Sequence, residues 1–108
     1  MTDTYIKKDI VGGADPAAVI DIGSNSIRYA AGRNGKKLVI TTRLGSGLAQ
    51  TGRLDEERME KSISVISALA SNARHSGYIP FAYATSAVRD ASNKAEFINR
   101  LKQKCGIT

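Results

Sequence analysis

Three short segments in the first half of the chain have the apolar pattern of β-strands. Residues 17–22 are apolar, with β-branched Val and Ile, except for Asp21, which suits an interior strand. The segments 26–33 and 36–43 follow. Asn34-Gly35 between them is typical of a two-residue hairpin turn, because both turn positions must accept a positive φ. The first half of the chain therefore predicts a meander of three strands.

Helical spacing replaces this pattern after Leu54. Acidic residues open the segment and Gly77 closes it, which favours a helix at both of its ends. The apolar positions between them recur at intervals of three or four and are Met59, Ile63, Ile66, Ala70 and Ala73. A fourth strand at 79–85 and a second helix at 93–104 are predicted to follow.

The second predicted helix has a start signal of its own. Asn93 is followed three positions later by Glu96, a spacing that resembles a capping box with Asn as the cap. Its apolar face is predicted to consist of Phe97, Ile98 and Leu101. The helix at 93–104 is therefore expected to pack against the sheet through one side.

Two stretches show neither period. Residues 1–16 end in Gly12-Gly-Ala-Asp-Pro16 and are predicted to be a flexible tail, and residues 44–52 are predicted to be a glycine-rich connection. The remaining order is β-β-β-α-β-α, an α/β class with a mixed sheet in which the last strand runs parallel to the first. This order is the opening of the ribonuclease H-like layout shared by the actin and hexokinase superfamily.

Composition places the chain among globular proteins. At 108 residues it is one domain or part of one, with 42% hydrophobic and 24% charged residues. No apolar run approaches the roughly 20 residues of a membrane span, and the first residues lack the pattern of a secretory signal. The single Cys105 agrees with a reducing compartment and is expected to be an inert thiol. We therefore expect a cytoplasmic protein with no membrane partner.

The formal charge of +6 points to an anionic partner without identifying it. The basic residues are scattered and are not interleaved with aromatic residues, so nucleic acid is not the expected partner. The lone His75 stands near the end of a predicted helix, where a surface role is expected. Charge alone leaves polyphosphate, nucleotide and nonspecific binding open.

The first predicted strand runs into a turn that suits phosphate. Asp21 is an acid in an apolar strand, so it lies either near a metal or among local hydrogen bonds. Gly23 has no Cβ to block an anion, and Ser24, Asn25 and Ser26 supply donors. A plain hairpin turn would use the same residue types, so both readings stand on chemistry alone.

Three motifs in order extend this observation. They are Ile20-Asp-Ile-Gly-Ser-Asn-Ser26, then Arg43-Leu-Gly-Ser-Gly-Leu48 with Gly52-Arg-Leu54, then Ala84-Thr-Ser-Ala-Val-Arg-Asp-Ala-Ser-Asn93. Together they resemble the N-terminal part of the exopolyphosphatase and guanosine pentaphosphate phosphohydrolase (Ppx/GppA) family over residues 18–107. The resemblance implies an acid anhydride hydrolase that removes terminal phosphate from inorganic polyphosphate or guanosine pentaphosphate, with Mg²⁺ or a similar divalent cation.

The resemblance also implies roles for individual residues. Gly23 to Ser26 would form the first phosphate loop, with Asn25 on the phosphate chain, and Asp21 would lie near the metal through water. Arg89 would be a cationic clamp at the end of the last strand, and Ser86 would assist in binding substrate. Alternatives remain open: Arg89 pairs with Asp90 or another surface acid, or Ser86 only caps a short turn.

The chain departs from the family pattern at its end. Relatives continue into a strand with a glutamate-rich motif that supplies the catalytic base, and then into a second glycine-rich phosphate loop. Neither follows Gly106. Residues 17–108 are therefore expected to be the N-terminal part of an actin-like phosphatase domain, inactive alone and completed by the remainder of a parent chain.

Two other functions compete with this hypothesis. One is a non-catalytic phosphate- or nucleotide-binding regulatory module, and the other is a sugar or acetate kinase relative, which the motifs around Arg43 and Arg89 disfavour. A further expectation is that the chain forms a homodimer or aggregates through one strand edge, or that its own flexible tail covers this edge. The strand at 79–85 is predicted at a sheet edge and is apolar and uncharged, with only Pro80 to discourage pairing with another chain.

Overall fold

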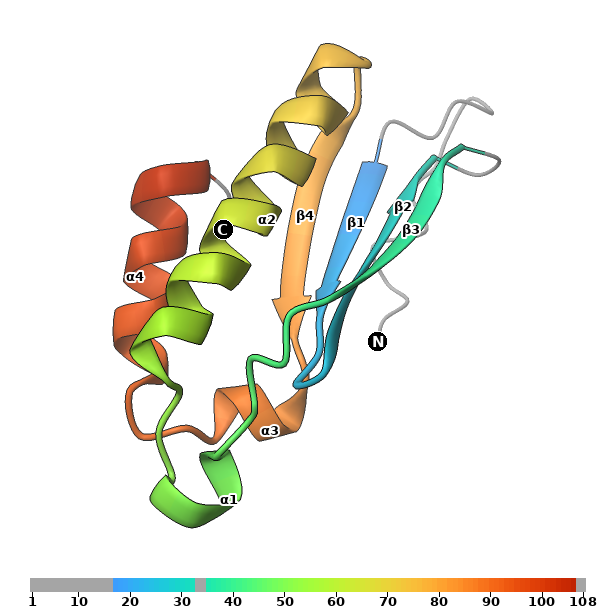
Figure 1. Cartoon of the computed structure of the whole chain (residues 1–108). Helices are drawn as coiled ribbons and strands as arrows, with labels where there is room; N and C mark the ends of the chain where they lie inside the picture. The colour runs from blue at the N-terminus through green and yellow to red at the C-terminus, as the bar shows by residue number, and fades with distance from the viewer. Residues whose placement is uncertain (1–16, 33–34, 107–108) are drawn as a thin grey trace.

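The computed structural model describes residues 17–32 and 35–106. The predicted tail at 1–16, and Arg33 and Asn34 of the predicted hairpin, lie outside these residues. Four strands form one mixed sheet in the order β3-β2-β1-β4 (Figure 1). They are β1 (Ala17–Ile22), β2 (Ser26–Ala31), β3 (Lys37–Thr41) and β4 (Ile79–Ala84).

The strand directions agree with the predicted topology. β1 is antiparallel to β2 and β2 is antiparallel to β3, whereas β4 lies parallel to β1. This parallel pairing needs a long crossover, and α2 (Glu56–His75) supplies it. The α/β class with a mixed sheet is therefore confirmed.

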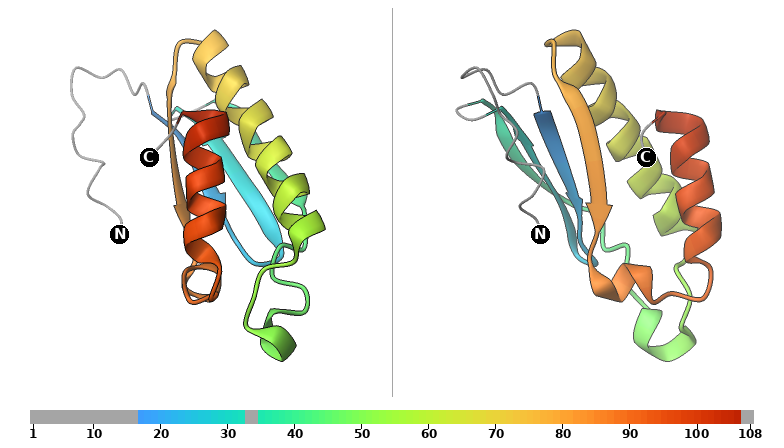
Figure 2. Two further views of the ribbon diagram at one scale, coloured as in Figure 1. Left: turned by 90° about the vertical axis from the view of Figure 1, so that its left-hand side faces the viewer. Right: turned by 180° about the vertical axis from the view of Figure 1, so that it is seen from behind.

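Two long helices cover one face of the sheet. α2 and α4 (Lys94–Cys105) lie side by side on the same face, as the view from behind in Figure 2 shows. Alternation along β1 explains which face they cover, since Ala18, Ile20 and Ile22 are buried beneath the helices. None of the helices described is long and apolar enough to cross a membrane.

The opposite face of the sheet carries large apolar side chains that no helix of the described chain covers. Val39, Ile79, Phe81 and Tyr83 are each between 49% and 60% exposed. β4 stands at one edge of the sheet, where the sequence predicted an edge strand. On α4, Phe97 and Leu101 are buried, whereas Ile98, predicted on the same apolar face, is 40% exposed.

Two predicted strands are too long. β3 was expected at 36–43 but ends at Thr41, because the amides of Thr42 and Arg43 both donate to the carbonyl of Asn25 instead of continuing the ladder. β2 was expected to run to Arg33 but ends at Ala31, where Gly32 takes a φ of 68°. Turn chemistry therefore ends both strands earlier than their apolar pattern suggests.

Two short helices were not predicted. α1 (Leu48–Thr51) lies within the glycine-rich connection, between Gly47 at φ 81° and Gly52 at φ 73°. α3 (Ser86–Arg89) follows β4 after one residue, Thr85. Each helix is four residues long, which is too short for a hydrophobic period to be recognised.

The capping box predicted at Asn93 is wrong. The Asn93 side chain makes no capping bond to α4. Its Oδ1 accepts a hydrogen bond from the Leu54 amide at 2.8 Å, and its Nδ2 donates to the Leu54 carbonyl at 3.0 Å. Asn93 therefore joins the start of α4 to the segment that precedes α2, while Asp55 caps α2 by accepting from the amide of Arg58.

Candidate functional site

The topology brings the loop after β1 and the helix after β4 to the same end of the sheet. Because the two strands are parallel, their carboxyl ends meet there, which is where open α/β sheets bind ligands. The ladder continues one step past β4, since the amide of Thr85 donates to the carbonyl of Ile22 at 3.1 Å. Figure 1 shows the β1–β2 loop and α3 at this common end, which we call the strand-end corner.

The loop from Gly23 to Ser26 is a tight turn. The amide of Gly23 donates to the carbonyl of Ser26 at 3.0 Å, and a Cβ at Gly23 would lie 2.9 Å from that oxygen. Among the described residues, the amides of Ser24 and Asn25 donate to no backbone acceptor. Adjacent amides of this kind form the concave nests that bind anions.

A second turn, at residues 42–45, supports the loop through backbone hydrogen bonds. The carbonyl of Ser24 accepts from the Gly45 amide at 2.7 Å, and the carbonyl of Asn25 accepts from the amides of Thr42 and Arg43. A Cβ at Gly45 would lie 2.6 Å from the Cβ of Ser24, so only glycine allows this approach. The carbonyls of Ser24 and Asn25 are therefore bonded within the protein.

Arg43 occupies an unusual backbone conformation in this turn. Its φ is 54°, and it is the one residue other than glycine with a positive φ in the described chain. Left-handed backbone costs a residue with a side chain about 1–2 kcal/mol. The sequence singled out the motif at 43–48 only by resemblance, and no local signal indicated that it braces the first loop.

Asp21 lies on the face of the sheet opposite the helices. It stands in register with Arg28 of β2 on one side and Tyr83 of β4 on the other. One carboxylate oxygen, Oδ1, is buried and has no hydrogen-bond partner in the described chain. Local hydrogen bonds, one of the two expectations for Asp21, are therefore not formed at Oδ1 by the described residues, and a nearby metal stays a prediction.

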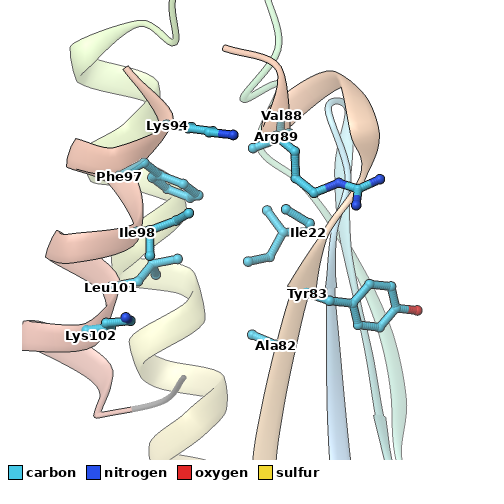
Figure 3. Close-up of a pocket in the computed structure, with 11 residues that line it drawn as sticks. Ile22, Ala82, Tyr83, Val88, Arg89, Lys94, Phe97, Ile98, Leu101 and Lys102 are labelled. Atoms are coloured by element: carbon cyan, nitrogen blue, oxygen red, sulfur yellow. The ribbon is translucent and has the colours of Figure 1, made fainter. Parts of the chain in front are cut away.

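Arg89 ends α3 at the same corner. Its amide donates to the carbonyl of Thr85 at 3.0 Å, which anchors the helix to the end of β4. The guanidinium is exposed, and the ion pairs of the described residues involve Arg58 and Arg100 rather than Arg89. Figure 3 shows its side chain extending away from α4, toward the side of β4 on which Tyr83 lies. The alternative pairing with Asp90 is therefore not formed, and Ser86 is placed only as the first residue of α3.

The strand-end corner fits a hydrated divalent cation better than a directly ligated one. The described residues contain no cluster of three or more His, Cys, Asp or Glu side chains that could hold a metal. Mg²⁺ retains several of its waters and commonly binds through one or two carboxylates together with phosphate oxygens. Asp21, with its unsatisfied Oδ1, suits contact with such a cation through water.

Three acidic residues of the long helices, Glu56, Glu60 and Glu96, form ion pairs away from the loop. Arg100 of α4 forms ion pairs with Glu56 at 2.8 Å and Glu60 at 2.9 Å of α2, and with Glu96 one turn before it. The hydrogen bond from Arg100 lowers the pKa of the Glu56 carboxyl, and the same bond raises the pKa of Arg100. The pairs with Glu56 and Glu60 join α2 to α4, and all three carboxylates are therefore bonded to Arg100 and not available as bases beside the loop.

A separate apolar groove lies between β4 and α4. Its volume is about 210 Å³, and apolar side chains such as Ala82, Phe97 and Leu101 line it (Figure 3). Lys94 and Lys102 also line it, but no set of polar groups converges inside. Cys105 is buried at the end of α4, and burial raises the pKa of its thiol, as expected for an inert cysteine.

Comparison with known proteins gives consistent matches. The sequence profile of the Ppx/GppA phosphatase family matches residues 35–108. Exopolyphosphatase 1 of Mycobacterium tuberculosis and that of Mycobacterium bovis are each 33% identical to the chain over 98 residues, which cover 82% of this chain and 28% of the relative. The chain thus spans about 28% of the length of these curated relatives.

Solved structures agree with the sequence matches. Crystal structures of the Aquifex aeolicus Ppx/GppA phosphatase, one of them a type II variant, superpose with TM-scores of 0.79 and 0.78 at 30% and 32% identity. These alignments cover 88% and 84% of this chain and 35% and 33% of the other. An exopolyphosphatase from Cytophaga hutchinsonii gives a TM-score of 0.74 at 26% identity, over 84% of this chain and 32% of that one.

Proposed function

The chain belongs to the Ppx/GppA phosphatase family, and on this premise we propose that it forms one wall of a site that removes terminal phosphate from inorganic polyphosphate or guanosine pentaphosphate. The observation that carries the proposal is the loop from Gly23 to Ser26. The carbonyls of Ser24 and Asn25 accept hydrogen bonds from the amides of residues 42, 43 and 45, and the amides of Ser24 and Asn25 donate to no backbone acceptor in the described part of the chain. A phosphate oxygen is the ligand that such amides suit.

In this mechanism the residues of the chain hold the substrate and neutralise its charge. The loop amides bind oxygens of the phosphate chain, and the guanidinium of Arg89 binds a neighbouring phosphate oxygen from α3. Asp21 would hold a hydrated Mg²⁺ by accepting a hydrogen bond from one of its waters. When bound, Mg²⁺ supplies further neutralisation of the phosphate charge. Positioning of this kind accounts for most of the catalysis of phosphoryl transfer.

We also propose that the chain alone binds phosphate but does not turn over. Glu56, Glu60 and Glu96 are held by Arg100, so none of them activates a water beside the loop. A missing general base lowers the rate about 10²–10⁴-fold. The same observation supports a second candidate function, a non-catalytic phosphate- or nucleotide-binding module.

Titration of the isotope-labelled chain with pyrophosphate and Mg²⁺ tests binding. Amide shifts are expected at Gly23 to Ser26 and near Arg89, and Arg89→Ala should weaken binding about tenfold, the value of one charge-assisted hydrogen bond. Arg74→Ala is the matched control, since Arg74 lies in the last turn of α2, at the end of this helix that is far from the strand-end corner. Shifts that follow the lysines at 36, 37, 102 and 104 instead would indicate nonspecific electrostatics and contradict the proposal.

Phosphate release from long-chain polyphosphate with Mg²⁺ tests turnover. We expect binding without measurable release by the purified chain. Rapid release would show that the described residues already contain a base and would refute the proposed inactivity. A parent chain that extends past Thr108 and releases phosphate would favour the hydrolase, whereas binding without release by that longer chain would favour the regulatory module.

A further inference from the structure

Buried polar atoms without hydrogen-bond partners are uncommon in folded proteins. Two such atoms of the described chain lie at the strand-end corner. The described chain has four such side-chain atoms, namely Asp21 Oδ1, Thr42 Oγ1, Ser62 Oγ and Thr85 Oγ1. Native proteins satisfy most buried polar side-chain atoms, so each exception needs an explanation. Asp21 and Thr85 come from neighbouring parallel strands, which makes this pair different from the other two.

The strand register places Asp21 and Thr85 on the same face of the sheet. Asp21 pairs with Tyr83, and Thr85 follows two positions later on the same side of the alternating backbone. The amide of Thr85 donates to the carbonyl of Ile22 at 3.1 Å, so the ladder holds at this position. The side chains of Thr85 and Asp21 therefore lie on adjacent strands, on the face opposite the helices, with Thr85 two positions beyond the residue that pairs with Asp21.

Thr85 also lies between the other elements of the proposed site. Its carbonyl accepts from the Arg89 amide at 3.0 Å, and its own amide is bonded to the strand that leads into the phosphate loop. In Figure 3 the side chain of Arg89 extends toward the same side of β4. Backbone bonds of Thr85 thus connect both α3 and β1 at the strand-end corner.

We propose that the hydroxyl of Thr85 and the carboxylate of Asp21 together bind the water shell of the divalent cation that accompanies the phosphate. This inference rests on the proposed function and adds Thr85 to it as a positioning residue. Waters on a divalent cation are strong hydrogen-bond donors, and both orphaned oxygens are acceptors. The carboxylate of Asp21 and the hydroxyl of Thr85 thus offer the water shell of the cation two acceptors on adjacent strands.

Two substitutions at Thr85 separate its hydroxyl from its shape. Thr85→Val keeps the shape and removes the hydroxyl, whereas Thr85→Ser keeps the hydroxyl. By calorimetry, Mg²⁺ should strengthen the binding of pyrophosphate to the wild type and to Thr85→Ser. In Thr85→Val this gain should fall about tenfold while affinity without Mg²⁺ stays the same. Thermal denaturation of each variant verifies that it is folded, and Thr85→Ala replaces Thr85→Val if the latter is not.

Ser62→Ala is the matched control. It removes another buried hydroxyl without a partner, from within α2, and should leave the effect of Mg²⁺ unchanged. Equal losses in Ser62→Ala and Thr85→Val would overturn the proposal, because the loss would then be a general effect of the substitution. An unchanged Mg²⁺ effect in folded Thr85→Val would also overturn it.

Mn²⁺ alone provides a readout that does not depend on phosphate binding. Paramagnetic broadening is expected around residues 21–25 and 84–89 of the wild type, and it should weaken in Thr85→Val. If pyrophosphate does not bind but this broadening is present, the proposed function fails and the cation site stands. If pyrophosphate binds and Mn²⁺ broadens neither segment, the proposed function stands and the role of Thr85 is wrong.

Discussion

Asn93 and Asp21 both have polar side-chain atoms in the interior of the protein, but these atoms differ in their hydrogen bonding. Asn93 is 8% exposed and uses both ends of its amide on the backbone of Leu54. Asp21 has a buried Oδ1 that no described residue hydrogen-bonds, and the hydroxyl of Thr85, at the end of the adjacent strand, is in the same state. The side-chain amide of Asn93 is thus bonded within the protein, whereas we propose that the two oxygens of the strand-end corner are satisfied by a bound group.

This difference indicates what each side chain does. A buried polar group that is fully bonded stabilises one arrangement of the chain, and its loss should appear in stability. A buried polar group without a partner costs stability, and its value should appear in binding. Substitutions of the two residues should therefore separate stability from binding.

The largest expected effect is the loss of the Asn93 bridge. Asn93→Ala removes two hydrogen bonds and leaves the amide and carbonyl of Leu54 buried without partners, which should lower the free energy of unfolding by about 2–4 kcal/mol. Urea denaturation measures this change. Asn99→Ala, at an exposed position of the same helix, should change it by less than about 0.5 kcal/mol. Equal effects of the two substitutions would show that the bridge does not stabilise the fold.

The next effect lies in the strand-end corner and should have the opposite character. Asp21→Asn keeps the shape and removes the charge, so stability should stay the same or rise, while the strengthening of pyrophosphate binding by Mg²⁺ should fall about tenfold. Calorimetry and urea denaturation of one preparation give both values. Glu57→Gln removes an equal charge at an exposed site in α2 and serves as the control. A loss of stability in Asp21→Asn without a loss of binding would show that Asp21, like Asn93, stabilises the fold and does not bind the cation.

A smaller effect is expected at the turn that supports the phosphate loop. Arg43→Gly relieves a positive φ while leaving the backbone bond to Asn25, so the free energy of unfolding should rise by about 0.5–1 kcal/mol. Arg53→Gly is the matched control, because Arg53 has no positive φ and glycine there only adds freedom to the unfolded chain. A loss of stability at Arg43 as large as that at Arg53 would show that no strain is stored at this turn.

The smallest effect concerns pH and the ion pairs of Arg100. The folded pKa of Glu56 is held below its ordinary value of 4.5 by the hydrogen bond from Arg100. Its stabilising contribution is therefore complete above that value and is lost as the pH falls through the folded pKa. Thermal midpoints should fall more steeply between about pH 5 and pH 3 for the wild type than for Glu56→Gln. Parallel curves would show that the contact contributes nothing measurable.

The sequence predicted the parts of this molecule that depend on local pattern or on parallel topology. Four strands and two long helices follow from apolar spacing, because apolar residues recur at the period that places them on one side of a strand or helix. The meeting of the Gly23 loop with Arg89 follows from the parallel pairing of the first and last strands. These features need no knowledge of individual side-chain contacts.

The remaining features depend on contacts between distant segments. Asn93 was predicted as a cap because Glu96 has the right spacing, but its partner is the backbone of Leu54, 39 positions away. The supporting turn at Arg43 and the orphaned hydroxyl of Thr85 are visible only once the strand ends are placed together. Such contacts cannot be predicted from local periodicity or propensity, because every residue has the same backbone groups whatever its side chain.

The parallel pairing of β1 with β4 also sets the order in which the chain should fold. β1, β2 and β3 join through short connections, whereas Ile20 must find Ala82 across the whole of α2. Contacts between residues so far apart form late and slowly, since closing the long loop costs entropy before any contact is gained. The strand-end corner should therefore be among the last parts of the domain to form. Phosphate binding would then report the end of folding rather than the presence of the meander.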